Sequence, residues 1–164
     1  MTKAARMVLK DCRDAANELI DGVQGGEWRR RWILVVVLLR AVGHVLEKVD
    51  GKESNDHKKA IEDWWDNCIK GDKQNHIIFW EFIEEERNSI IKEYKPTAGQ
   101  GITITLSSNP SDHQTSYDYK IYSGYYAGKN QREVLNEAFT WWELQLNEVD
   151  KKIVRRQLIN GNQE

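Results

Sequence analysis

The residues best suited to chemistry lie close together, in the segment from Phe79 to Tyr94, which reads FWEFIEEERNSIIKEY. Within it, Arg87 and Asn88 are followed by Lys92 and the terminal tyrosine. A guanidinium can hold a phosphate with two parallel hydrogen bonds, and an ammonium can hold it as a point charge. The amide and the phenol add neutral hydrogen-bonding groups. This set of side chains indicates binding of a phosphate-containing ligand.

Apolar residues at three- and four-residue steps predict that this segment is an amphipathic helix. One stripe on the helix consists of Trp80, Ile83, Arg87, Ile91 and Tyr94. A guanidinium on a core-facing stripe is costly unless a partner compensates its charge. Arg87 therefore either lies at the mouth of a groove or pairs with a carboxylate, for which Glu84 to Glu86 are candidates. A purely structural arginine, buried by its stem and paired at its head, is the alternative.

The run from Arg87 to Tyr94 resembles the Arg-Asn-x3-His-x-Tyr signature of the HEPN superfamily. Arg87, Asn88 and Tyr94 match position by position, whereas Lys92 stands where the family usually has its histidine. HEPN proteins are small helical bundles, and many are metal-independent ribonucleases that work as dimers in toxin or phage-defence systems. That histidine is expected to act at the scissile phosphate, so phosphate binding survives the departure at Lys92 better than cleavage does.

A second polar pair, Arg40 and His44, lies one helical turn apart at the end of an apolar run. An imidazole titrates near neutrality, as general acid–base catalysis requires. If this pair faces Arg87 across a groove, His44 supplies the acid–base group that Lys92 does not. The alternative is that both are satisfied polar residues at the end of the core. Gly43 between them either allows a close helix approach or leaves space for a ligand.

Composition limits the remaining classes of function. A chain of 164 residues with seven tryptophans and 40% apolar content suits one globular domain. The net charge of −2 excludes a generally basic nucleic-acid coat and leaves room for a local basic patch. Cys12 and Cys68 lie on apolar helix faces, which favours free buried thiols in a reducing cytosol. With four scattered histidines they offer no metal-ligand spacing, so we expect no metal and no cofactor.

Helices must position these residues, and hydrophobic periodicity predicts five of them. They span residues 4–20, 27–49, 56–70, about 76–95 and 130–157. The second helix contains eight consecutive apolar residues, 32–39, and the helical period continues beyond them. A helix that is apolar all round is either central in the fold or buries one face in a dimer. It is too short and too charged at its ends to span a membrane.

Residues 97–129 differ in character from the rest of the chain. Alternation over 102–106 predicts a short strand, and 117–122 can return as its antiparallel partner after a polar loop containing Asn109 and Pro110. A two-stranded ribbon is marginal alone, so we expect it to lie against the helices. Five tyrosines between 117 and 126 could stack on bases or form an interface. Ribbon packing with solvent-facing hydroxyls is the alternative.

The sequence therefore predicts a mainly α fold, a HEPN-like bundle of about five helices with a small β-hairpin inserted before the last helix. We expect one domain, 1–164, with the hairpin insert at about 99–128. The N-terminus has charges where a signal peptide needs an apolar run, so we expect a cytoplasmic protein without membrane association.

The leading functional prediction is a HEPN-like nucleic-acid-associated protein, a metal-independent ribonuclease of a toxin–antitoxin or phage-defence system. The resemblance implies a homodimer in which facing motifs form a shared groove for RNA. The candidate catalytic residues are Arg87, Asn88, Lys92, Tyr94, His44 and Arg40. One alternative is a catalytically inactive HEPN scaffold that binds a protein partner, such as an antitoxin or a regulator. Another is a small-molecule pocket lined by Trp80, Arg87 and the tyrosines.

Overall fold

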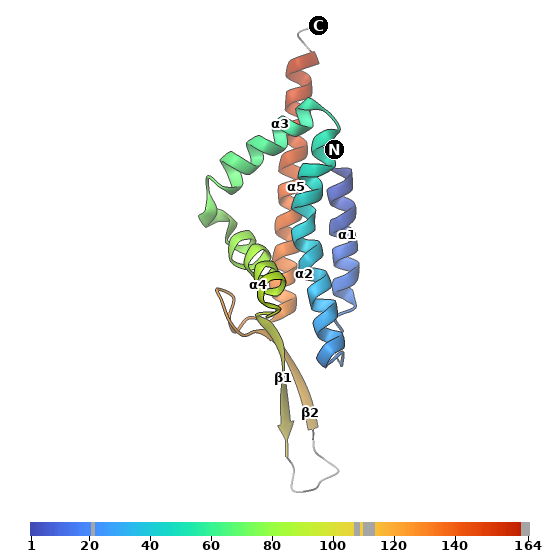
Figure 1. Ribbon diagram of the computed structural model, residues 1–164, viewed down its shortest axis with the longest axis vertical. Helices are drawn as coiled ribbons and strands as arrows, with labels where there is room; N and C mark the ends of the chain where they lie inside the picture. Colours follow the sequence, from blue (N-terminus) through green and yellow to red (C-terminus); the bar gives the residue numbers. More distant parts are fainter. Residues whose placement is uncertain (21, 107–108, 110–113, 162–164) are drawn as a thin grey trace.

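The computed structural model describes residues 1–20, 22–106, 109 and 114–161, and shows a helical bundle from which a two-stranded ribbon projects (Figure 1). The helices are α1 (Lys3–Asn17), α2 (Gly25–Lys48), α3 (Asn55–Asp63), α4 (Glu85–Glu93) and α5 (Gln131–Gly161). The strands are β1 (Ala98–Thr105) and β2 (Gln114–Ile121). The predicted fold, five helices with a hairpin before the last, is confirmed. Pro110 of the predicted polar loop lies outside the described residues.

The core is built around α2, along which α1 packs, while α5 contacts both α1 and α3. The long apolar run of α2 buries one side in this core, with Trp32, Val35 and Leu39 all inaccessible to solvent. From α5, Trp142 and Leu146 are equally buried. The prediction that this run belongs to a helix is confirmed. Within the described part of the chain, no helix is long and apolar enough to cross a membrane.

The third and fourth predicted helices differ from expectation, because each contains a π-helical turn. These turns span Trp64–Ile69 and Phe79–Glu84, so that α3 is shorter than predicted and α4 begins only at Glu85. A π-helical turn widens the helix by one residue and re-aims the side chains around it. Two aromatic pairs, 64–65 and 79–80, occupy these turns, and Trp65 of the first contacts Phe79 of the second edge-to-face. Tertiary aromatic packing, which periodicity does not reveal, accompanies both interruptions.

The hairpin packs on the bundle at its base and leaves it along its length (Figure 1). At the base, Ala98 of β1 pairs with Ile121 of β2, and both are buried. Directly paired residues lie on the same face of an antiparallel ribbon. Farther out on that face, Ile102 and Ile104 are 61% and 59% exposed. Packing against the helices is therefore confirmed for the base only, and β1 starts earlier than predicted because it begins in the core.

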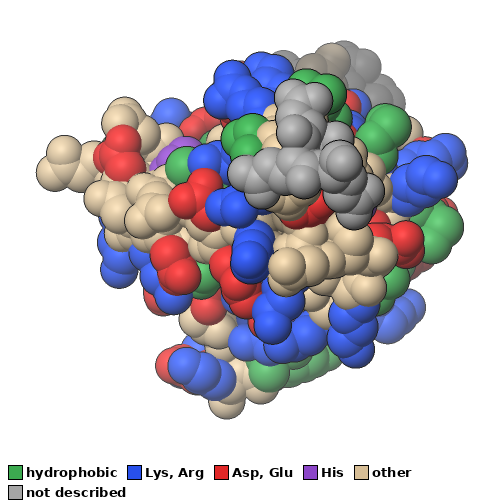
Figure 2. All heavy atoms as spheres, turned by 90° about the horizontal axis from the view of Figure 1, so that it is seen from above, with side chains coloured by type: hydrophobic (Ala, Val, Ile, Leu, Met, Phe, Trp, Pro, Cys, Tyr) green, Lys and Arg blue, Asp and Glu red, His purple; other side chains and the backbone are tan. Residues whose placement is uncertain are grey.

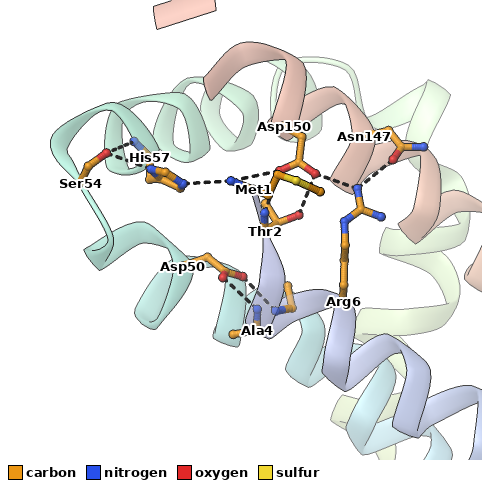
Figure 3. Close-up of polar contacts among 10 residues, drawn as sticks. Met1, Thr2, Ala4, Arg6, Asp50, Ser54, His57, Asn147 and Asp150 are labelled. Atoms are coloured by element: carbon orange, nitrogen blue, oxygen red, sulfur yellow. Dashed lines mark hydrogen bonds and ion pairs between the residues drawn. The ribbon is translucent and has the colours of Figure 1, made fainter. Parts of the chain in front are cut away.

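Carboxylates from other elements hold the start of α1, as Figure 3 shows. Asp50, just after α2, accepts hydrogen bonds of 2.9 Å from the backbone amides of both Ala4 and Ala5. Asp150 of α5 accepts from the guanidinium of Arg6 at 2.8 Å. The first amides of a helix have no partner within the helix, and here a distant residue supplies one. Asp50 is 2% exposed, and nothing in the sequence pattern singled it out.

We expect Asp50→Ala to lower the free energy of unfolding by about 2–3 kcal/mol, because it leaves two inward-facing amides without acceptors. Urea denaturation monitored by circular dichroism measures this change. The matched control is Asp14→Ala, since Asp14 forms an exposed pair with Lys10 whose loss should leave the stability nearly unchanged. Equal stability of the two variants would contradict the capping role.

Candidate functional site

The charged residues of interest lie where α2 contacts α4 and the π-helical turn before it. Arg40 of α2 forms an ion pair with Glu84, and both side chains are largely buried. The guanidinium of Arg40 also lies 5.6 Å from the centre of the Phe79 ring, a cation–π distance. Arg40 is therefore fixed in place and partly neutralised. Of the two alternatives for Arg40, these contacts match the satisfied polar residue.

His44 lies one turn farther along α2, where the charges of Arg40 and Arg87 both affect its pKa. Partial desolvation lowers the pKa of His44 below its ordinary 6.5, and the positive charges of Arg40 and Arg87 lower it further. Glu47 and Glu84 oppose this shift. The structure thus brings Arg40, His44 and Arg87 within electrostatic range of one another. These three residues form the seam cluster. The imidazole of His44 is predominantly neutral at neutral pH.

Arg87 is half-buried, and its partner is an amide rather than a carboxylate. Its guanidinium donates to the side-chain oxygen of the adjacent Asn88 at 3.0 Å. Among the described residues, no carboxylate lies within ion-pair distance of Arg87. Of the three acidic candidates, Glu84 pairs with Arg40, Glu85 is exposed, and Glu86 bonds elsewhere. The positive charge of Arg87 therefore remains available to an anion.

Asn88 and Lys92 line a hollow of about 910 Å³ between α4 and the segment that joins β2 to α5. Its aromatic wall includes Trp80, Tyr125 and Tyr126, whereas Arg87 is not among its lining residues. The hollow also contains several glutamates, which oppose an anionic ligand. Lys92 is exposed at its edge. The structure therefore separates Lys92 from the seam cluster, although the hydrogen bond from Arg87 to Asn88 joins the two regions.

Tyr94 ends α4 in a left-handed conformation, with φ of 55°. Its ring is 62% exposed and lies 5.8 Å from the guanidinium carbon of Arg29, at the start of α2. A bulky residue with positive φ is uncommon, because its Cβ crowds the backbone. This turn directs Tyr94 toward the N-terminal end of α2. The six candidate residues thus do not converge on one point, and only the seam cluster is brought together.

Glu86 is a buried acidic residue whose importance the sequence analysis missed. It is 2% exposed and accepts a hydrogen bond of 2.7 Å from the indole of Trp32 on α2. It also accepts from the backbone amide of Thr97 at 3.0 Å and from the hydroxyl of the same residue. One carboxylate therefore joins α2, α4 and the chain entering β1. The sequence did hold one signal, an acidic residue within a segment of helical period. Only the fold shows which groups donate hydrogen bonds to Glu86.

Gly43 permits a close approach of α2 and α5. A Cβ atom at this position would lie 3.1 Å from the Trp142 ring, closer than side chains normally pack. The sequence analysis left close approach and space for a ligand as alternatives for this glycine. The first is observed at Gly43 itself, and a cavity lies beside it.

We expect Glu86→Ala to lower the free energy of unfolding by about 3 kcal/mol, because it leaves the hydrogen-bond donors of Trp32 and Thr97 without an acceptor. Chemical denaturation checks the magnitude, and near-ultraviolet circular dichroism reports the altered environment of the indole. Glu85→Ala is the control, because Glu85 is adjacent but exposed and its loss changes stability by about 0.5 kcal/mol or less. A Glu86 variant as stable as this control would show that the carboxylate does not organise the seam.

Among the described residues, no group of three or more His, Cys, Asp or Glu side chains could hold a metal ion. Burial raises the pKa of the Cys12 thiol to about 12, so this cysteine is a poor nucleophile or ligand near neutral pH. Comparisons with protein families, curated proteins and solved structures give no match. The function must therefore be inferred from the geometry of the seam cluster and from the resemblance of residues 87–94 to the HEPN signature.

Proposed function

We propose that this protein is HEPN-like, associates with RNA and cleaves it without a metal at the seam cluster. The observation that carries the proposal is that Arg40 and His44 line one cavity on α2, and that α2 contacts α4, the helix of Arg87, whose charge acts on His44. Arg87 has no carboxylate partner among the described residues, so a phosphate is a suitable ligand for it. The toxin or phage-defence setting is the one that the resemblance implies.

The chemistry follows from the charge state of each group. Neutral His44 removes the proton from a ribose 2′-hydroxyl, whose oxygen attacks the neighbouring phosphorus. Arg87 and Arg40 stabilise the charge that develops on the non-bridging oxygens. The bond to the 5′-oxygen breaks, water protonates that oxygen, and a 2′,3′-cyclic phosphate remains. In this scheme Lys92 and Tyr94 do not act on the scissile phosphate.

A second copy of this chain is the partner that suits the exposed face of α2. Leu34, Val37, Ala41 and His44 follow one another at helical spacing, so they share a face. Leu34 is 48% exposed, an unusual exposure for a residue in the middle of the apolar run. On α4, Ile91 is exposed one turn beyond Arg87. A two-fold contact over these apolar residues would bring two seam clusters into one groove.

The surface charge favours local contacts with RNA rather than a broad basic coat. Figure 2, which shows the end of the bundle where α5 terminates, has basic and acidic side chains interspersed. Arg29 and Arg30, at the start of α2, are exposed basic residues away from the seam cluster. A limited number of phosphate contacts is consistent with the net charge of −2. Binding should therefore depend strongly on the few arginines at the seam.

One observation favours the alternative, an inactive HEPN scaffold that binds a protein partner. Lys92 replaces the histidine of the family signature, and in this fold it lies outside the seam cluster. Tyr94 is likewise directed away, toward Arg29. A scaffold that does not catalyse a reaction does not need Lys92 and Tyr94 to lie beside the seam cluster. The two candidates make opposite predictions in the same assay.

We expect the protein to cleave mixed RNA in the presence of a chelator, and His44→Ala or Arg87→Ala to reduce the rate about a hundredfold or more. Because His44 must be neutral to accept a proton, the rate should rise with pH through its pKa, which lies below 6.5, and then level off. Gel analysis of end-labelled RNA measures the rate.

The control is Lys10→Ala, which removes one positive charge from an exposed pair on α1 and should leave the rate unchanged. Thermal unfolding of each variant shows that it is folded. Absence of cleavage by the folded parent would exclude the ribonuclease and favour the scaffold. Cleavage that survives both seam substitutions would place the active site elsewhere.

We expect Leu34→Asp to shift a homodimer to monomer, because it places a charge within an apolar contact. Sedimentation velocity or light scattering measures the mass in solution. Met7→Asp is the matched control, since Met7 is 62% exposed on α1, away from the seam. A parent protein that is monomeric at high micromolar concentration would exclude this dimer.

A further inference from the structure

Arg29 and Arg30, in the first turns of α2, have guanidinium groups that lie beside the same glycine. A Cβ atom built on Gly26 would lie 3.3 Å from Nη1 of Arg30 and 3.8 Å from Nη2 of Arg29. Both arginines are exposed, and within the described part of the chain neither forms an ion pair with a carboxylate. Two positive charges therefore converge here without a neutralising partner.

The stability of α2 does not account for these two arginines. The start of a helix carries a partial positive charge, so acidic side chains are favoured there and basic ones are not. Arg31, the third basic residue of this segment, has a structural role, because it pairs with Glu27 at 2.6 Å. Arg29 and Arg30 add positive charge at the unfavourable end of the helix. An anion bound by both guanidinium groups would remove their mutual repulsion.

The ring of Tyr94 lies beside Arg29 at the surface. It is 62% exposed, and the guanidinium carbon of Arg29 is 5.8 Å from its centre. Tyr94 ends α4 with φ of 55°, in the left-handed conformation that glycine adopts without strain. Glycine would therefore suit the fold better than tyrosine at this position. An exposed aromatic ring next to a guanidinium group is a surface on which a nucleobase stacks.

Arg29, Arg30 and Tyr94 form the outer patch, which lies along the same contact between α2 and α4 as the seam cluster. Arg29 and Arg40 are about three helical turns apart, so they lie on one face of α2. At 1.5 Å per residue, the outer patch is about 16 Å from the seam cluster along α2. One extended strand can therefore contact both sites, whereas a single nucleotide cannot.

We propose that the outer patch binds single-stranded RNA outside the cleavage site, with a phosphate on Arg29 and Arg30 and a base stacked on Tyr94. The inference rests on the proposed function, because it gives the same RNA a second point of contact with the protein. Phosphate pairing and stacking on one tyrosine carry little information about base sequence. The outer patch therefore adds affinity for single strands of any sequence that reach beyond the scissile phosphate.

Binding of a fluorescently labelled octauridylate with 2′-O-methyl groups tests this inference. No 2′-hydroxyl remains to attack the phosphorus, so binding is measured whether or not the protein is a ribonuclease. We expect the double variant Arg29→Gln/Arg30→Gln, and separately Tyr94→Gly, to raise the dissociation constant about tenfold. Fluorescence anisotropy measures it. Added salt should weaken the double variant less than the parent, because fewer phosphate contacts remain.

Two comparisons separate binding by the outer patch from other effects. Because glycine fits the positive φ at position 94, Tyr94→Gly should unfold at the same temperature as the parent or higher, although it binds RNA more weakly. The matched control for the arginines is Arg155→Gln/Arg156→Gln, an adjacent pair near the end of α5, at the opposite end of the bundle (Figure 1). This control should bind as the parent does, to within about twofold.

An unchanged dissociation constant in both outer-patch variants would overturn the inference, as would equal weakening by the α5 control. Failure of the parent to bind the octauridylate at high micromolar concentration would also overturn it. Binding that depends on the outer patch, in a protein that cleaves no RNA, would support the patch and contradict the ribonuclease. Cleavage of mixed RNA by a protein whose outer-patch variants bind as the parent does would support the ribonuclease and contradict the patch.

Discussion

The buried carboxylate of Glu86 is the constraint on which the arrangement of the site depends. A carboxylate removed from water must find donors, and here they come from Trp32 on α2 and from Thr97 at the entry to the ribbon. These bonds fix the rotation of α4 about its axis. Because Arg87 is the next residue, its direction relative to α2 is fixed at the same time. The position of the hairpin base follows from the same contacts.

The second determinant is α2, which serves the core, the seam and the cavity with different faces. One face buries Trp32 and Leu39, a neighbouring face carries Arg40 to the cavity, and the outward face exposes Leu34. The 3.6-residue period points successive side chains in different directions around the helix axis. A helix that is apolar over most of its circumference therefore packs several of its faces against different parts of the protein. Gly43 then lets Trp142 approach closely, which forms part of the cavity wall. Packing and site geometry are therefore not separable in this fold.

Sequence patterns predicted the helices and the hairpin because long periodic segments are governed by burial, which the order of apolar residues records. The same patterns did not reveal the π-helical turns, since these accompany contacts such as that between Trp65 and Phe79. Nor did they predict that Asp50 would cap α1, because its amide partners lie more than forty residues away in the chain. Such contacts depend on which helices become neighbours.

For the site, the sequence by itself determined which side chains were available and on which helices they would lie. It placed Arg40 and His44 on one face of α2, and the motif residues on the fourth helix. Only the tertiary structure decided that the charge of Arg87 acts on His44, that Glu84 pairs with Arg40, and that Lys92 lines another hollow. The physical reason is that helical spacing fixes angles within one helix, whereas charge pairing and burial depend on the distance and rotation between two.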